Sequence, residues 1–314
     1  VPCPGDSAVL RRLLDALDTQ TYRRFDLVLL PDAPIPDFPE RPWLSVRPTG
    51  PMRPAQKRNL GARAAQGEVL AFIDDDAYPR TDWLANAAAR IAGPNAIDAL
   101  GGPGLTPPDD PPRAQLSGLV LASPLVSGNF RCRYFIQGPL RRVEDFPSCN
   151  LFVRKSAFEA IGGFREDYWP GEDTLLCADL QAAGHTLWYD PRVVVFHHRR
   201  PLFGPHLRQV GRYALHRGHF ARRFGHNSRR LSYHLPTLFL LGFLLGPLAI
   251  ALCPLLALPY CAVVALWLGL TALDALIEAP TLRAVLPLWL GILATHLVYG
   301  ARFLQGFLAP ALPN

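Results

Sequence analysis

Apolar residues recur at two spacings in the first part of the chain. Leucines stand at helical spacing over residues 10–17, and the pattern at 56–65 predicts a second helix. The continuous apolar runs at 25–30 and 69–73 are typical of buried strands. Because the two kinds of run alternate, we predict an α/β fold in which helices flank a sheet.

The pattern changes near residue 231. No Asp, Glu, Lys or Arg occurs from Leu231 through Leu273. As one helix this stretch would be roughly 65 Å long, about twice the thickness of the hydrocarbon core of a bilayer, so it has to fold back on itself. A buried helical core of a soluble protein is the alternative. We predict that residues 231–314 form a membrane domain with two or three transmembrane helices.

Prolines indicate where the apolar stretch turns back. Pro254 and Pro259 bound a short turn between two spans. A third stretch contains Arg302, so it could cross the membrane or lie along its interface. The candidate spans are residues 235–253, 260–277 and 285–308.

A basic segment lies directly before the membrane domain. Residues 201–230 carry many arginines, interleaved with aromatic residues and histidines. We expect an amphipathic interfacial segment on anionic membrane lipids. By the positive-inside rule the preceding domain is cytoplasmic, which predicts a multi-pass protein of the cell's inner (plasma) membrane.

Composition narrows the function classes. Hydrophobic residues make up 49% and charged residues 18% of the chain, which excludes intrinsic disorder and suits a protein partly embedded in lipid. The net charge of +6 suits an anionic substrate or membrane surface, and we expect no nucleic-acid partner. Six cysteines without paired spacing predict reduced thiols rather than a disulfide framework.

Three carboxylates follow the apolar run at 69–73. Asp74, Asp75 and Asp76 would therefore lie at the carboxyl end of a strand, where open α/β sheets bind ligands. Adjacent negative charges repel unless a cation or hydrogen-bond donors compensate them. Strand alternation places Asp74 and Asp76 on one face, where they could hold Mg²⁺ or Mn²⁺. A solvated turn that caps a helix is the alternative.

A second acidic site completes a series of motifs in residues 1–200. The motifs are, in chain order, Val1-Pro2, Gln20-Thr21-Tyr22, Asp32, Lys57-Arg58-Asn59-Leu60-Gly61, Phe72-Ile73-Asp74-Asp75-Asp76, Asn150-Leu151-Phe152-Val153-Arg154, Ile161-Gly162-Gly163-Phe164, Gly171-Glu172-Asp173 and His197. This series resembles that of the family 2 glycosyltransferases, inverting enzymes with the GT-A nucleotide-sugar-binding fold. With its C-terminal apolar helices, the chain is similar to transferases that build exopolysaccharide repeat units.

The resemblance implies three domains and a set of site residues. The domains would be a GT-A domain at 1–200, the basic interfacial segment at 201–230 and the membrane domain at 231–314. Asp173 would be the catalytic general base. The metal ion, Mg²⁺ or Mn²⁺, would be held by Asp74, Asp76 and His197. The residues expected to bind the donor are Asp32, Arg58, Asn59, Asp74, Asp75, Arg208 and Arg212.

The implied roles have simpler alternatives. Asp173 could cap the following helix, as could Glu172. His197 could be an ordinary strand-end histidine. Arg58 and Asn59 could occupy an exposed helix face.

The donor site has individual assignments under the same resemblance. Asp32 would contact the nucleotide base, or would merely end a strand. Arg208 or Arg212 would add positive charge beside the phosphates. The proline-rich stretch 101–138 matches no motif, and we expect a variable loop on the acceptor side.

These features predict the activity. We expect inverting, metal-dependent transfer of a sugar from a UDP- or GDP-sugar to a lipid-linked acceptor at the cytoplasmic membrane face, in polysaccharide or glycolipid biosynthesis. The first alternative is a processive polysaccharide synthase, although Gln209-Val210-Gly211-Arg212-Tyr213 lacks the final Trp of the processive motif. The second is a catalytically silent membrane scaffold or nucleotide-sugar sensor.

Overall fold

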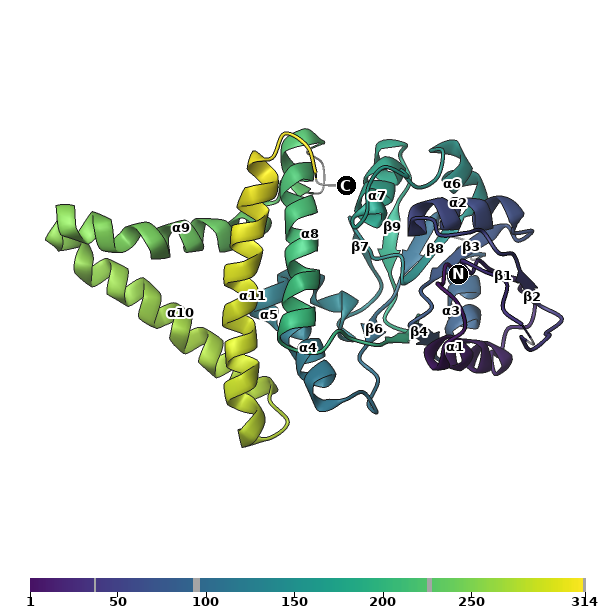
Figure 1. Ribbon diagram of the computed structural model, residues 1–314, viewed down its shortest axis with the longest axis horizontal. Helices are drawn as coiled ribbons and strands as arrows, with labels where there is room; N and C mark the ends of the chain where they lie inside the picture. Colours follow the sequence, from purple (N-terminus) through teal and green to yellow (C-terminus); the bar gives the residue numbers. More distant parts are fainter. Residues whose placement is uncertain (37, 93–96, 225–227, 313–314) are drawn as a thin grey trace. The chain divides into compact units, whose positions relative to one another are not determined.

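The computed structural model describes residues 1–36, 38–92, 97–224 and 228–312. The chain divides into two compact units (Figure 1). The first unit comprises Val1–Pro107 and Cys132–His198, and the second Pro108–Arg131 and Arg199–Asn314. The basic segment predicted at 201–230 therefore falls in the second unit, and its residues 225–227 lie outside the described part of the chain.

A mixed five-stranded sheet is the centre of the first unit (Figure 1). The pairs β3–β8, β8–β5 and β9–β7 are antiparallel, and the pair β5–β9 is parallel. Its strands, in spatial order, are β3 (Val69–Ile73), β8 (Asn150–Arg154), β5 (Ala99–Gly101), β9 (Leu187–Tyr189) and β7 (Arg141–Val143). The strand predicted at 69–73 is confirmed, as is the α/β fold class.

Two smaller sheets extend the first unit. One contains β4, β10 and β6, and the other is the parallel pair β1–β2. Their bounds are Leu27–Leu29 for β1, Leu44–Val46 for β2, Ala77–Pro79 for β4, Gly104–Leu105 for β6 and Val195–His197 for β10. The strand predicted at 25–30 therefore exists in a shorter form, as β1.

Helices cover the central sheet. Ser7 caps the first of them, because its Oγ accepts a hydrogen bond of 3.1 Å from the Leu10 backbone N–H. All the leucines predicted at helical spacing in this helix are buried. The helices of the first unit are α1 (Ala8–Asp18), α2 (Pro54–Ala64), α3 (Trp83–Ile91), α6 (Lys155–Ala160) and α7 (Glu172–Ala182).

The central sheet is buried on both faces. Phe72 and Leu151 pack in one hydrophobic cluster, whereas their chain neighbours Ile73 and Phe152 pack in another. Successive residues of a strand point to opposite faces, so each cluster belongs to one face of the sheet. A sheet with two buried faces explains the continuous apolar runs in its strands.

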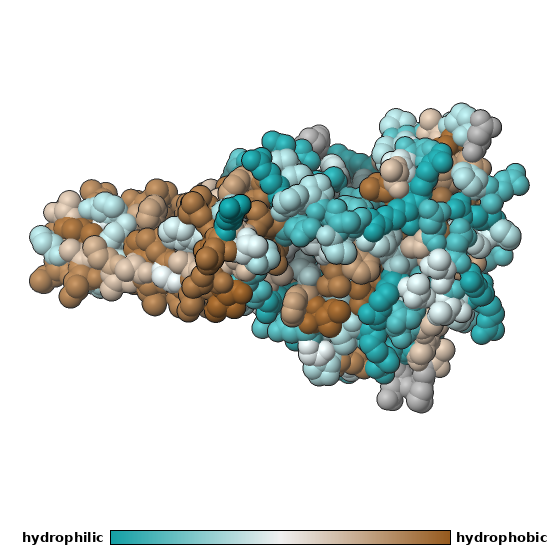
Figure 2. Space-filling view, turned by 90° about the horizontal axis from the view of Figure 1, so that it is seen from below, coloured by the Kyte–Doolittle hydropathy of each residue, from teal (hydrophilic) through white to brown (hydrophobic). Residues whose placement is uncertain are grey.

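The second unit is helical. Three of its helices are long and apolar enough to cross a membrane, with mean hydropathy of 2.2, 2.0 and 1.6 in their most apolar windows. Hydrophobic side chains cover the α9–α10 hairpin in Figure 2. The helices are α4 (Pro112–Ala122), α5 (Pro124–Ser127), α8 (Gly204–Arg223), α9 (Leu231–Leu252), α10 (Ala257–Glu278) and α11 (Leu282–Leu308), with 3₁₀ turns at η1 (Gly128–Arg133) and η3 (Pro254–Leu256).

Glycines let the long helices of the second unit approach closely. A Cβ at Gly306 would lie 1.8 Å from the Leu215 carbonyl oxygen of α8, and one at Gly218 would lie 2.1 Å from the Phe303 carbonyl oxygen of α11. At Gly300 it would meet the Pro236 carbonyl oxygen of α9 at 2.4 Å. Close backbone contact through small residues is a common way for membrane helices to associate.

The prediction of a loop over residues 101–138 is wrong. The stretch contains β6, α4, α5 and η1. Pro112 opens α4 instead of breaking it, because the first turn of a helix needs no backbone N–H from that residue. Val120 of this helix packs against Leu288 and Ile292 of α11. Residues 108–131 thus belong with the C-terminal helices, and the domain boundaries at 200 and 230 stay predictions.

Candidate active site

The acidic end of β3 meets a histidine from β10. The chain passes from β3 through Asp74, Asp75 and Asp76 into β4, which pairs with β10 so that Ala77 lies opposite His197. This register places His197 Nε2 3.1 Å from Asp76 Oδ1. One side-chain ligand atom from each of Asp74, Asp76 and His197 lies within 4.8 Å of the others. The structure therefore brings together the three residues predicted to bind a metal ion.

The His197 imidazole lies in a strongly negative environment. Burial disfavours its charged form, but Cys149 and Asp76 outweigh burial and raise the pKa of His197 to about 10. A divalent cation held by the same atoms would compete with this proton. Two carboxylates and one imidazole are a donor set that suits such a cation.

A buried ammonium holds Asp32 in place. Lys57 of α2 donates hydrogen bonds of 2.9 Å to the carbonyl oxygens of Cys3 and Leu30, and it also pairs with the Asp32 carboxylate. The Lys57 side chain is almost fully buried, whereas that of Asp32 is partly exposed. Asp32 is thus fixed at the end of β1 with access to solvent, as a residue that contacts a nucleotide would need to be.

Arg58 connects the two acidic motifs. Its Nη2 donates to Asp74 Oδ1 at 2.7 Å, and its Nη1 donates to Glu172 Oε1 at 2.6 Å. Burial lowers the pKa of Arg58, but the negative charges of Asp74 and Glu172 have the larger combined effect and raise this pKa above its ordinary value. The side chain is only 7% exposed, so the alternative of an exposed helix face is wrong. Arg58 compensates one carboxylate of each motif.

Asn59 bonds to the protein itself. Its Nδ2 donates to the Phe164 carbonyl oxygen at 2.9 Å and to Glu166 Oε1 at 2.8 Å, and its Oδ1 accepts from the Phe164 backbone N–H at 2.9 Å. The side chain is buried, which again excludes an exposed face. These bonds hold the turn at Phe164 and give no support to the predicted role of Asn59 in donor binding.

Asp173 lies in the first turn of α7. Its Oδ1 accepts a hydrogen bond of 2.8 Å from the Thr174 backbone N–H, and the N-cap position is occupied by Gly171. Burial, and then the charges of Glu172 and Asp145, raise the pKa of Asp173 to about 7. A carboxylate with a pKa near neutrality is well suited to accept a proton from a substrate.

Asp75 faces the start of the chain. Burial and then the charge of Asp75 raise the pKa of the Cys3 thiol to about 11. All cysteines of the chain are free, and Cys3 is buried. Asp75 therefore acts on the side of β1, where Asp32 also lies, and its predicted role at the donor remains a prediction.

Comparison with known proteins identifies the domain that carries this geometry. The model of a family described as "Glycosyl transferase family 2" matches residues 1–162, about half of the chain. The chain belongs to glycosyl transferase family 2. Its nucleotide-sugar-binding GT-A fold carries the acidic cluster at the carboxyl end of β3, the edge at which such sheets bind ligands.

Curated relatives each match about half of the chain. A pre-mycofactocin glycosyltransferase of Mycobacterium tuberculosis is 32% identical over 147 residues, which are 47% of this chain and 30% of that protein. Glycosyltransferase AglE of Haloferax volcanii is 29% identical over 153 residues, or 48% of this chain and 46% of that protein. The chain spans less than half the length of these curated relatives.

A solved structure resembles nearly the whole chain. The mannosyltransferase PcManGT from Pyrobaculum calidifontis, solved in complex with GDP-Man and Mn2+, has a TM-score of 0.61 at 20% identity. The likeness covers 96% of this chain and 85% of that chain. It shows the shared fold.

Two acids near Asp173 had no part in the predicted site of this family 2 domain. Glu172 figured only as a helix cap, yet it pairs with Arg58. Asp145 is buried between β7 and β8, 3.2 Å from Arg133 Nη2 and 3.3 Å from Thr174 Oγ1. The Gly-Glu-Asp motif offered a signal for Glu172, but no local pattern marks Asp145.

Arg208 and Arg212 lie on α8. This helix belongs to the second unit, so the geometry of the acidic site in the first unit does not include them. Their role beside the donor phosphates stays a prediction.

Proposed function

We propose that this chain is an inverting, metal-dependent glycosyltransferase. It moves a sugar from a nucleotide sugar to a lipid-linked acceptor at the cytoplasmic face of the inner (plasma) membrane, in polysaccharide or glycolipid assembly. The observation that carries the proposal is the grouping of Asp74, Asp76 and His197 within 4.8 Å in a family 2 domain.

The metal-binding part of the proposal rests on the donor set. Asp74, Asp76 and His197 would hold Mg²⁺ or Mn²⁺. When bound, the cation would neutralise negative charge on the departing nucleoside diphosphate. Asp32, positioned by Lys57, would contact the nucleotide base. The solved relative PcManGT binds GDP-Man and Mn2+, which makes these the first donor and metal to test.

The catalytic part of the proposal rests on Asp173. Its carboxylate takes the proton of the acceptor hydroxyl while that oxygen attacks the anomeric carbon. The bond from this carbon to the phosphate oxygen breaks on the opposite side, so the configuration inverts. Half-buried near Glu172 and Asp145, Asp173 has a pKa of about 7 and exchanges a proton readily at neutral pH.

The acceptor part of the proposal rests on the second unit. Three apolar helices would keep the enzyme at a membrane, where acceptors carried on lipids are found. Arginines directly before α9 favour a cytoplasmic location for the chain that precedes it.

The deciding experiment measures transfer by membranes that contain this chain. Radiolabelled GDP- and UDP-sugars are added with Mn²⁺, and label is counted in organic-extractable and in insoluble material. We expect label in the organic phase, its loss with EDTA, and its return with excess Mn²⁺. Asp173→Asn should abolish transfer but keep metal-dependent nucleotide binding.

The matched control is Asp179→Asn. Asp179 lies on the same helix but pairs with Arg165 at the surface, so this variant should transfer normally. Label confined to insoluble polymer would show a processive synthase instead. Nucleotide binding without transfer to any fraction would show a silent scaffold or sensor.

A further inference from the structure

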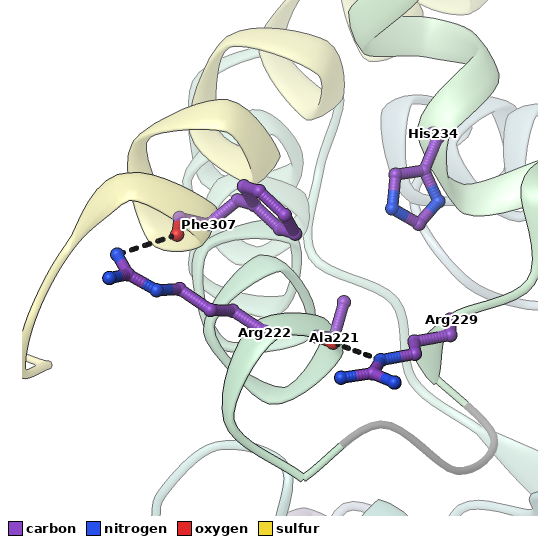
Figure 3. A pocket seen from close by; sticks show the side chains of 5 residues that line it. All are labelled: Ala221, Arg222, Arg229, His234 and Phe307. Atoms are coloured by element: carbon purple, nitrogen blue, oxygen red, sulfur yellow. Dashed lines mark hydrogen bonds between the residues drawn. The ribbon is translucent and has the colours of Figure 1, made fainter.

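A cavity with a basic lining lies within the second unit, at the ends of three helices. It measures about 370 Å³ and is lined by Ala221, Arg222, Arg229, His234 and Phe307 (Figure 3). Ala221 and Arg222 come from the last turn of α8, His234 from the first turn of α9, and Phe307 from the last turn of α11. We call it the arginine pocket.

Backbone carbonyls orient the two guanidinium groups of the arginine pocket. Arg222 Nη1 donates to the Phe307 carbonyl oxygen at 3.4 Å, and Arg229 Nε donates to the Ala221 carbonyl oxygen at 2.9 Å (Figure 3). Arg222 Nη1 also donates to the Leu308 carbonyl oxygen at 3.1 Å. These bonds use one nitrogen of each group, and a guanidinium carries five N–H donors in a fixed fork. Both arginines are solvent-exposed, so donors remain available to an anion.

The histidine of the pocket is held in the same way. Its Nδ1 lies 3.1 Å from the Arg230 carbonyl oxygen, so Nδ1 carries a proton and donates it there. The imidazole is therefore fixed in one orientation. The pocket offers two oriented guanidinium groups and this imidazole.

The sequence on either side of these groups is free of Asp and Glu. The chain has no Asp or Glu from Pro191 through Leu273, and none after Glu278. The second unit carries thirteen arginines and four carboxylates, a net charge of +9. The positive charge of this region also acts on His219 of α8. Its pKa is lowered by burial first, and further by the charges of Arg223 and Arg222. Among the described residues, Arg222 and Arg229 bond to backbone carbonyls and pair with no carboxylate. Such a positive site favours an external anion.

Exposed leucines on the same helix ends indicate what carries that anion. Leu231, Leu235 and Leu308 belong to the same helix ends as His234 and Phe307, and they are 69%, 53% and 63% exposed. All three lie on helices that are apolar enough to cross a membrane. Arginine forks match phosphate oxygens, and exposed leucines suit acyl chains. An inorganic ion would bind to the arginine forks but would make no use of the exposed leucines.

We propose that the arginine pocket binds the phosphate group of an anionic phospholipid, with Arg222 and Arg229 on the phosphate oxygens and the lipid chains along the leucines. This site would tie the junction of α8, α9 and α11 to the headgroup layer. The inference does not depend on glycosyl transfer.

The test uses the full chain purified in an uncharged detergent. Retention of dioleoylphosphatidylglycerol and of dioleoylphosphatidylcholine is measured by native mass spectrometry and by titration, at a fixed salt concentration. The pocket variant is Arg222→Gln with Arg229→Gln. The control variant is Arg223→Gln with Arg283→Gln, which loses the same charge at exposed positions outside the lining.

We expect the pocket variant to bind phosphatidylglycerol at least about tenfold more weakly, because charge-assisted hydrogen bonds are lost. The control variant should stay within about twofold of the unaltered protein. If both variants bound phosphatidylglycerol equally weakly, the proposal would be overturned, because the lipid would then be held by a diffuse positive surface. Equal affinity for phosphatidylcholine would overturn the need for an anion.

Inorganic phosphate distinguishes the two sources of the anion. If millimolar phosphate displaces phosphatidylglycerol completely and binds as tightly, the site is one for free anions and the lipid assignment is wrong. Should the double variant fail to fold, Arg229→Lys provides the second test. It keeps the charge but loses the fork, so we expect several-fold weaker retention of phosphatidylglycerol, and unchanged retention would overturn the proposal.

Discussion

The two units of this chain handle charge in opposite ways. The first carries 22 carboxylates against 19 basic residues, and it places acids next to buried cations at its candidate site. The second has a net charge of +9, supplied by arginine alone, since both lysines of the chain lie in the first unit. The first arrangement suits a site that recruits a divalent cation, and the second suits an anionic membrane surface.

Packing differs between the units as well. Large side chains fill both faces of the central sheet in the first unit, whereas in the second the backbones of α8 and α11 touch through Gly218 and Gly306. The second unit also leaves many leucines exposed. A water-soluble core hides its apolar groups, but helices in lipid need only close contact with one another.

The largest expected effect is on catalysis in the first unit. Asp173→Asn should lower kcat/KM about 10²–10⁴-fold, because an amide cannot accept the acceptor's proton. The measurement is the initial rate of sugar transfer at saturating Mn²⁺. Asp179→Asn should stay within about twofold, and a similar loss in both variants would show that Asp173 has no special role.

Removal of the buried cation tests how the first unit compensates its acids. Arg58→Met should lower the free energy of unfolding by about 3–5 kcal/mol, since it leaves Asp74 and Glu172 as uncompensated charges. Hydrogen exchange of α2 and α7 peptides provides the measurement. Arg165→Met, which breaks a surface pair with Asp179, should cost about 1 kcal/mol or less. Equal costs would contradict the buried bridge.

Glycine contacts test how the second unit packs. Gly306→Ala should destabilise the α8–α11 pair by about 1–3 kcal/mol, because the new methyl group would overlap the Leu215 carbonyl oxygen. Thermal unfolding in detergent reports the effect. Gly242→Ala places its methyl group in open space on α9 and should be neutral or slightly stabilising. If Gly306→Ala left the thermal stability unchanged, the close approach of the α8 and α11 backbones would be ruled out.

The pH dependence of transfer should show the raised pKa of Asp173. The base acts in its charged form, so kcat/KM should fall as the pH drops below about 7 and approach a tenfold loss per pH unit. Glu172→Gln removes a negative charge beside Asp173, so the fall in kcat/KM should begin at a lower pH. A flat profile between pH 5 and 8 would exclude Asp173 as the base.

The pH dependence of folding stability due to Asp173 should be opposite to that of kcat/KM. Its folded pKa lies above the ordinary value of 3.8, so the protonated form is favoured in the folded protein. The contribution of this group to stability is therefore greatest at low pH and is lost as the pH rises towards about 7.

Local patterns predicted much of the fold. The strand at 69–73, the leucine helix of α1 and the apolar helices of the second unit are all where periodicity and length placed them. These signals are local because each depends on residues within one element. The prolines of 101–138 were wrongly interpreted as loop residues, since Pro112 stands in the first turn of α4, where proline is well tolerated.

The candidate site was only partly visible in the sequence. Strand alternation brought Asp74 and Asp76 together, and the family resemblance added His197 and Asp173. Neither indicated that Arg58 is buried between the two acidic motifs, or that Asn59 holds a turn. An exposed and a buried polar residue on a helix look alike until the neighbouring elements are known.

The sequence by itself determined many of the elements, the long apolar helices and the family, because hydrophobic spacing and motif order are properties of the chain alone. Only the tertiary structure decided the partners of the charges. His197 meets Asp76 because β10 pairs with β4 in one register. Arg58 meets Glu172 because α2 and α7 pack on the same face of the central sheet. Contacts between residues more than a hundred positions apart follow from packing, which no local pattern encodes.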